Sequence, residues 1–311
     1  MARSLLTLKD ISREDFFSIL DKARALKADI KQQKTINALR NKVVGILFEK
    51  PSTRTRASFE VAVLRLGGKA VYLSSSELQL KRGEPVKDTA RILGSYMDGL
   101  VARVYDHQTV EELAQHAGVP VINGLSDFTH PTQAVCDLFT VMEVKGKLEG
   151  LTLAYIGDGN NVCHSLLLCC ALAGMNMTAA CPSGYHPDPG ILRNAAQIAE
   201  ESGNNISIVK DPRIAAEGAD ILYTDVWVSM GEEEEKETKL KVFQDYQINA
   251  DLLKAAAKDA SVMHCLPAYR GLEITEDVME GPQSIVWRQG ENKMHGAAAI
   301  LDFFMSDEKK V

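Results

Sequence analysis

The segment KVVGILFEKPSTRTRASFEVAVLRLGGKAVYL, residues 42–73, decides the fold of this chain. Its first run, KVVGILF at 42–48, is short and rich in Val and Ile, which predicts a buried strand. Apolar Phe59, Val63 and Leu66 then follow the i, i+4, i+7 spacing of a helix, and a Gly-Gly pair ends that helix. The closing run KAVYL predicts a second strand. A strand, a helix and a strand in this order indicate two parallel strands joined by a crossover helix.

The same alternation continues outward in two series. In the first series we predict helices at 12–26, 86–97, 109–118 and 130–150, and further strands at 99–103 and 120–125. In the second series we predict strands at 151–156, 175–181, 206–210, 219–227 and 261–267, and helices at 162–174, 191–203 and 292–305. Strands that alternate with helices of this length imply parallel sheets. The fold class is therefore α/β, with two domains, each a mainly parallel sheet flanked by helices. We expect domains at 1–135 and 151–290, a connecting helix within 136–150, and a C-terminal helix within 291–311.

Composition excludes several classes of protein. The 311 residues carry 35 Lys and Arg against 42 Asp and Glu, a net charge of −7, whereas nucleic-acid binders usually have a basic excess. Six Cys without a CxxC pair indicate neither a disulfide framework nor a structural zinc site, and reduced thiols favour the cytoplasm. The N-terminus does not resemble a signal peptide. The longest strongly apolar stretch, Leu166 to Met175, is half of the roughly 20 residues that cross a bilayer, so we expect no membrane span.

The residues between the first predicted strand and helix could bind phosphate. The free N–H groups of a helix start point at whatever lies ahead of it. Ser52, Thr53 and Thr55 add hydroxyl donors there, and Arg54 adds a planar charged fork that suits phosphate. Spacing alone fits equally well a capped helix that carries two surface arginines.

Two further strand ends carry polar side chains. Arg103 closes the predicted strand GLVAR, and His130 and Gln133 lie one helical turn apart where the next strand leads into a helix. His130 on its own fits a purely structural role as well. In open α/β sheets, however, ligands bind beyond the carboxyl ends of the strands. The agreement of these positions with Ser52–Thr55 predicts one site at this edge of the sheet.

The second series has candidates of a different chemical kind. GDGNN at 157–161 resembles the start of a dinucleotide fingerprint, but Val162 stands where its third glycine belongs. Asn161 could instead hold an amino-acid carboxylate, and Asp225, with Ser229 and Met230 after it, could bind an ammonium group. Cys265 follows the last predicted strand, where a cysteine serves as a nucleophile, a ligand contact or a buried apolar thiol.

Taken in order, the motifs FEKPSTRTR, DTAR, HPTQ, GDGNN, TDVWVSMG and HCLP resemble those of the ornithine carbamoyltransferases, from about residue 3 to about residue 305. The resemblance implies two domains, with the C-terminal helix packed back on the first. It implies that the chain moves the carbamoyl group of carbamoyl phosphate to the δ-amine of L-ornithine, giving L-citrulline and phosphate. It requires no metal and no cofactor. It also implies a homotrimer, or a higher assembly of trimers.

The same resemblance assigns roles by position. Residues implied to bind carbamoyl phosphate are Ser52, Thr53, Arg54, Thr55, Gln79, Arg103, His130, Pro131, Thr132, Gln133, Cys265, Leu266 and Lys293. Residues implied to bind ornithine are Asn161, Asp225, Ser229 and Met230, and those implied to act in catalysis are Arg103, His130, Asp225 and Cys265. Lys293 departs from the pattern, because the family usually has Arg there. Lysine keeps the positive charge but loses the guanidinium fork.

Other functions remain open at this point. A carbamoyltransferase that uses putrescine or aspartate is the nearest, although the Ser229-Met230 segment favours ornithine, since putrescine has no carboxylate or α-amine to bind there. A dinucleotide-dependent oxidoreductase would leave PSTRTR without a role. A non-catalytic sensor of a phosphate ligand would not need the other site residues. The direction of the reaction in the cell does not follow from these residues, because synthesis and breakdown of citrulline use the same groups.

Overall fold

The computed structural model describes residues 2–74, 78–79, 83–229 and 233–307. Contacts divide the chain into two units, Met1–Phe139 with Glu291–Val311, and Thr140–Gly290. Two helices cross the division along the chain: α5 (Pro131–Lys145) and α12 (Val286–Met305). Within the described residues, no helix is long and apolar enough to cross a membrane.

The first unit is built on a parallel sheet with the strand order β2-β1-β3-β4. Its strands are β1 (Val43–Phe48), β2 (Lys69–Ser74), β3 (Gly99–Arg103) and β4 (Val121–Leu125). Its helices, besides parts of α5 and α12, are α1 (Arg13–Lys31), α2 (Thr53–Arg65), α3 (Val86–Tyr96) and α4 (His107–His116). Most of these bounds agree closely with the predicted ones, but α1 continues five residues beyond its predicted end at residue 26. Helix α4 starts two residues early because the Asp106 side chain caps it.

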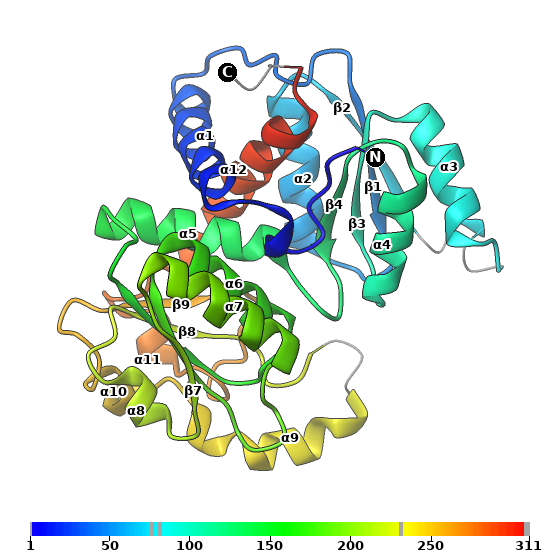
Figure 1. The fold of residues 1–311 in the computed structure, drawn as a ribbon. Coiled ribbons are helices and arrows are strands. Elements are labelled where there is room, and N and C mark those ends of the chain that lie inside the picture. Colours follow the sequence, from blue (N-terminus) through cyan, green and yellow to red (C-terminus); the bar gives the residue numbers. More distant parts are fainter. Residues whose placement is uncertain (1, 75–77, 80–82, 230–232, 308–311) are drawn as a thin grey trace. The chain divides into compact units, whose positions relative to one another are not determined.

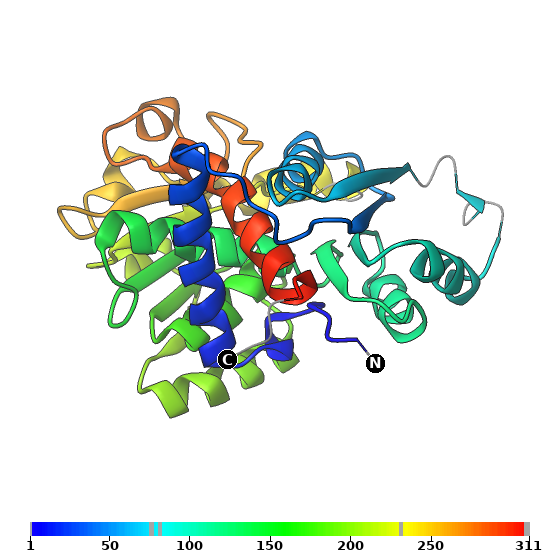
Figure 2. The same cartoon turned by 90° about the horizontal axis from the view of Figure 1, so that it is seen from above.

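The C-terminal helix packs on the first unit. Figure 2 shows α12 running beside α1, and hydrogen bonds from Lys22 Nζ to Asp302 Oδ2 (2.9 Å) and from Lys27 Nζ to Asn292 Oδ1 (2.6 Å) join the two helices. A Cβ at Gly296 would collide with Cys136, so glycine allows α12 to approach α5 closely. The predicted return of this helix is confirmed. It begins at Val286, six residues earlier than predicted.

The second unit has a five-stranded parallel sheet with the order β7-β6-β5-β8-β9. Its strands are β5 (Thr152–Ile156), β6 (Asn176–Ala180), β7 (Ile206–Val209), β8 (Ile221–Thr224) and β9 (Ser261–His264). Its helices are α6 (Asn161–Ala173), α7 (Pro189–Ser202), α8 (Pro212–Ala216), α9 (Lys236–Val242), α10 (Ala250–Leu253) and α11 (Glu276–Met279). Helices cover both faces of this sheet (Figure 1), and the predicted fold class is confirmed.

Helix α6 is a buried central element of the second unit. Every residue from Val162 to Ala173 is buried, so this helix is covered all around its circumference. Asn160 caps its start, and Gly174 ends it in the left-handed conformation, at φ +73°. The helix therefore has a fixed first turn, which is the part of it that meets the candidate site.

Candidate functional site

Each sheet has one place where neighbouring strands are followed by connections that leave in opposite directions. In the first unit this place lies between β1 and β3, and in the second between β5 and β8. Ligands of open α/β proteins bind at such points, beyond the carboxyl ends of the strands. Many of the residues that the sequence singles out end or follow these four strands, and His130, Gln133 and Cys265 follow the neighbouring strands β4 and β9.

The start of α2 has the geometry of an anion site. Ser52 is the cap, and its Oγ accepts the N–H of Thr55 at 3.3 Å. Thr55 is buried, while Thr53 and Arg54 are exposed at the first turn. The two arginines of the motif differ in their contacts: Arg56 donates to Glu60 Oε1 at 2.9 Å and stacks on the Tyr72 ring. Arg56 is therefore a surface arginine with partners of its own, as one of the two interpretations of the motif expected. Arg54 remains the candidate for phosphate binding.

Sequence reasoning passed over Lys50, two residues before this cap. Its side chain is only 8% exposed, and its ammonium lies 4.5 Å from the centroid of the Tyr105 ring. A buried lysine next to a helix start adds positive charge where an anion would bind. The only signal in the sequence was the position of Lys50 immediately before Pro51. That position does not predict that the side chain is buried against Tyr105, which lies more than 50 residues later in the chain.

Arg103 and His130 are both nearly buried, at 5% and 4% exposure. Burial holds the pKa of His130 well below its ordinary value of 6.5, and the positive charges of Lys293 and Arg103 lower it further. At neutral pH the imidazole is therefore uncharged and can donate one N–H to a ligand. Thr132 Oγ1 lies 3.4 Å from His130 Nδ1, on the turn that Pro131 opens.

Gln133 links helices α5 and α12. Its Oε1 accepts a hydrogen bond from Lys293 Nζ, and its Nε2 donates to Asp137 Oδ1 at 2.7 Å. All three side chains are buried, with exposures of 8% or less. Lys293 is thus held within the first unit beside His130, and Asp137 is a further member of this cluster that the sequence did not point to.

The pKa of His130 leads to a prediction about stability. Because the folded-state pKa is depressed, the unfolded chain binds the extra proton first as the pH falls. The contribution is fully present above about pH 6.5 and is lost as the pH falls from there toward the folded-state pKa, by at most about 1.4 kcal/mol per pH unit. We expect His130→Gln to lose less melting temperature than the wild type between pH 7.5 and pH 5.5, as measured by calorimetry. Equal losses in the two proteins would contradict a neutral, buried His130.

Two further residues were predicted to belong to the site. Gln79 is exposed and lies between β2 and α3, so its proposed contact with a neighbouring subunit stays a prediction. Met230 lies outside the described residues.

In the second unit, the end of β8 is tied to the end of β5. Thr224 Oγ1 donates to the carbonyl oxygen of Ile156 at 2.7 Å, and Asp225 follows directly, at 7% exposure. Asn161, the first residue of α6, and Ser229, four residues after Asp225, are both half-buried. The structure thus places a carboxylate and the start of a helix at one edge of the sheet, as the sequence predicted.

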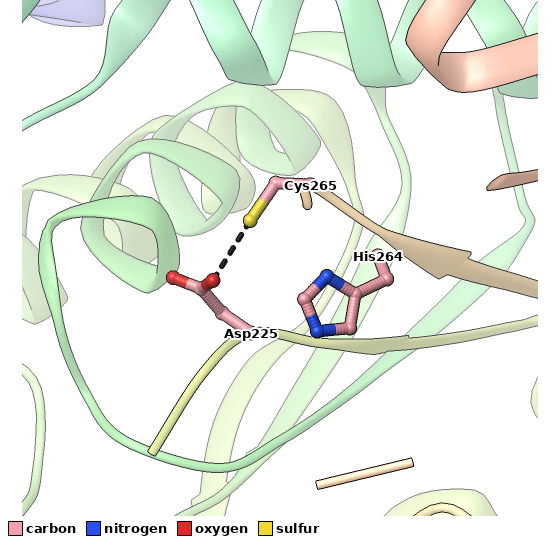
Figure 3. Close-up of side chains that lie close together, drawn as sticks. All are labelled: Asp225, His264 and Cys265. Carbon is pink, nitrogen blue, oxygen red and sulfur yellow. Dashed lines mark hydrogen bonds between the residues drawn. The ribbon is translucent and has the colours of Figure 1, made fainter. Parts of the chain in front are cut away.

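Cys265 lies beside Asp225. Its Sγ donates to Asp225 Oδ1 at 2.8 Å, and Figure 3 shows the two side chains facing each other. Cys265 is the one half-buried cysteine, whereas the other five are buried. The reading of Cys265 as merely a small buried apolar residue is therefore wrong, since its thiol has a charged partner.

His264, also drawn in Figure 3, has a structural role. Its Nδ1 accepts the N–H of Leu266 at 2.9 Å, and its Nε2 lies 3.1 Å from Glu273 Oε1. Leu266 is held by this contact in the left-handed region, at φ +61°. Asp225, His264 and Cys265 each place a potential metal ligand within 4.8 Å of the others. Coordination through either nitrogen of His264 would, however, break one of its two contacts.

The glycines of GDGNN have structural reasons of their own. A Cβ at Gly159 would collide with the backbone of His186 and Pro187, and the Gly159 N–H donates to the Tyr185 carbonyl oxygen at 2.9 Å. Asp158 is held by the buried Lys239, whose Nζ lies 2.6 Å from Asp158 Oδ2. Close packing of this turn therefore accounts for its small residues without a dinucleotide.

Comparison with known proteins identifies relatives over the whole chain. Residues 3–143 match the model of the aspartate/ornithine carbamoyltransferase carbamoyl-P binding domain, and residues 149–304 match that of the Asp/Orn binding domain. An ornithine carbamoyltransferase from Pyrococcus abyssi is 48% identical, over 99% of this chain and 97% of that protein. An enzyme from Pyrococcus furiosus named as the anabolic ornithine carbamoyltransferase is also 48% identical, over 99% and 98%.

Solved structures agree. An ornithine carbamoyltransferase structure from P. furiosus has a TM-score of 0.96 at 48% identity, covering 99% of this chain and 98% of that one. The corresponding structure from Gloeobacter violaceus has a TM-score of 0.88 at 46% identity, covering 98% and 99%.

Proposed function

The chain belongs to the aspartate/ornithine carbamoyltransferase family, and we propose that it transfers the carbamoyl group of carbamoyl phosphate to the δ-amine of L-ornithine, giving L-citrulline and phosphate. The observation that carries this proposal is the contrast between the two sheet edges. The first unit presents cations, a neutral imidazole and a helix start, which suit a phosphate and a carbonyl. The second presents a carboxylate and an amide, which suit an amino acid.

In the first unit, Ser52, Thr53, Arg54 and Thr55 bind the phosphate group. Arg103 and His130 donate to the carbonyl oxygen, where negative charge develops as the amine attacks. Such preorganised donors are usually the largest catalytic contribution, and a neutral His130 supplies one without adding a further cation. Gln133, Pro131 and Thr132 hold the carbamoyl end, and Lys293 takes the place of the usual arginine. Gln79 serves the site of a neighbouring subunit.

In the second unit, Asn161 binds the α-carboxylate of ornithine and Asp225 binds its α-ammonium. Ser229 and Met230 complete this end of the site. Cys265 and Leu266 lie where the two substrates meet. The hydrogen bond between Cys265 and Asp225 supports this assignment, because it places the thiol next to the group that receives the ammonium.

The chemistry forms one bond and breaks one. The δ-nitrogen attacks the carbonyl carbon, a C–N bond forms, and the C–O bond to phosphate breaks. An alkylammonium has a pKa near 10.4, so ornithine must lose a proton before it attacks and a second one afterwards. Holding both substrates in position lowers the activation free energy, because the reacting atoms no longer have to meet by diffusion. Arg54 and the start of α2 stabilise the phosphate as it leaves.

We also propose a homotrimer in the cytoplasm that works in arginine biosynthesis. Exposed apolar side chains on α2, β2 and α3, namely Val61, Leu64, Val71, Ile92 and Tyr96, favour an interface on the first unit. Six free cysteines fit a reducing compartment. The name of the P. furiosus relative supports the biosynthetic direction. Light scattering should give about three times 34.1 kDa, and a monomer mass would contradict the trimer.

The decisive experiment offers carbamoyl phosphate with ornithine, putrescine or aspartate separately and measures the carbamoylated product. We expect citrulline from ornithine and no turnover of the other two amines. Turnover of putrescine in place of ornithine would show that Asp225 and Ser229 do not select an amino acid. No turnover of any amine, with phosphate still bound, would favour a phosphate-ligand sensor.

A further inference from the structure

Asn160 makes contacts to both parts of the proposed ornithine site. Its Oδ1 accepts the N–H groups of Val162 and Cys163, at 3.0 and 3.1 Å, and so caps the start of α6. Its Nδ2 donates to Asp225 Oδ2 at 2.9 Å, across 65 residues of sequence. One side chain therefore connects the helix that carries Asn161 to the carboxylate that follows β8.

The Asp225 carboxylate is held from both sides. Its Oδ1 accepts the Cys265 thiol at 2.8 Å and the N–H of Val226 at 2.8 Å. Asn160 holds the other oxygen, Oδ2. An amide is suited to this task, because one end accepts from the helix while the other donates to a carboxylate. An ionised aspartate can only accept, and serine has a single oxygen on a shorter side chain for both contacts.

We propose that Asn160 is a positioning residue for the amino-acid substrate: it fixes the Asp225 carboxylate relative to the start of α6, and so sets the spacing between the groups that receive the α-ammonium and the α-carboxylate. This inference rests on the proposed function. Asn160 acts through Asp225 and Asn161 and does not itself take part in the chemistry. A substrate with both α-groups depends on this spacing, whereas carbamoyl phosphate does not.

Asn160→Asp tests the proposal sharply. Aspartate caps a helix about as well as asparagine, so the start of α6 should be kept and the protein should still fold. The new carboxylate faces Asp225 in place of an N–H donor, and two carboxylates in contact repel or share a proton. We expect the KM for ornithine to rise roughly tenfold or more, with the KM for carbamoyl phosphate unchanged. Asn160→Ser keeps a cap oxygen and adds no charge, and should give a smaller rise in the same direction.

A direct binding measurement tests recognition of the α-carboxylate and α-ammonium groups independently of carbamoyl transfer. L-Norvaline is ornithine without its δ-amine, so it probes only the amino-acid end. In the presence of carbamoyl phosphate, Asn160→Asp should bind it roughly tenfold more weakly than the wild type by calorimetry. The deficit should shrink at lower pH, because a proton shared between the two carboxylates removes their repulsion.

Asn249→Asp is the matched control. Asn249 caps α10 in the same unit with the same pattern, accepting the N–H groups of Asp251 and Leu252. We expect both KM values to stay at the wild-type level in this variant. An Asn160→Asp protein that is stable and binds ornithine as well as the wild type would overturn the inference, and so would an equal rise in both KM values. If the wild type itself does not carbamoylate ornithine, the proposed function has failed instead.

Discussion

Replacing Asp225 with asparagine should lower kcat/KM for ornithine by roughly 10²–10³-fold, since removing one partner of a buried charge pair costs about 2–5 kcal/mol. The carboxylate is 7% exposed and accepts hydrogen bonds from Cys265 and Asn160. An amide in its place keeps the shape but offers the substrate's ammonium no negative charge. Initial rates with ornithine varied at saturating carbamoyl phosphate measure the effect.

The control for this variant lies at the opposite end of the same strand, β8. Asp220 precedes β8 and accepts the Thr152 N–H at 2.8 Å, away from the carboxyl end of the strand. Asp220→Asn should affect the melting temperature and leave both KM values unchanged. If Asp225→Asn retained wild-type kcat/KM, the assignment of the amino-acid end would be wrong.

Replacing Lys293 with methionine should lower kcat/KM for carbamoyl phosphate by roughly 10²-fold, about 2.7 kcal/mol. Methionine has a similar length and suits a buried position, so the main change is the lost ammonium that contacts Gln133. The loss of this charge should also let the pKa of His130 rise toward its ordinary value, because Lys293 is one of the causes that lower it.

Lys293→Arg separates charge from packing. The guanidinium restores the cation and adds a fork, so we expect activity within about fivefold of the wild type. Steady-state rates with carbamoyl phosphate varied, together with melting temperatures, cover both variants. Wild-type activity in Lys293→Met would remove Lys293 from the site, and a large loss in Lys293→Arg would mean that the pocket around α12 fits only the slimmer side chain.

The sequence predicted the elements whose signals are local. The strand ending at Arg103 was predicted with the bounds it has in the structure, because its apolar run is short and its flanks are polar. The cap at Ser12, with Asp15 in the first turn of α1, was predicted for the same reason. The start of α12 was missed, since WRQGEN has no clear helical periodicity and its register is fixed by packing.

The candidate site divides in the same way. Residues at the end of a strand or directly after it, such as Arg103 and Asp225, could be found from position along the chain. Asn160, Asp137 and Glu273 could not, because their parts depend on contacts with elements far apart in sequence. The sequence could not distinguish the two arginines of STRTR either, because the Tyr72 ring that contacts Arg56 lies on β2, later in the chain.

The division of the chain has a consequence for its biosynthesis. The first unit consists of the residues up to Phe139 and the last stretch from Glu291, so the second unit is inserted within it. Domains usually fold in the order in which the ribosome releases them. Here the inserted part is translated in full before the outer part is complete, and α1 has its partner α12 only after the second unit has been made. A premature stop between Gly290 and Lys293 would release a chain that holds the whole second unit but lacks Lys293 and the part of α12 that packs on α1.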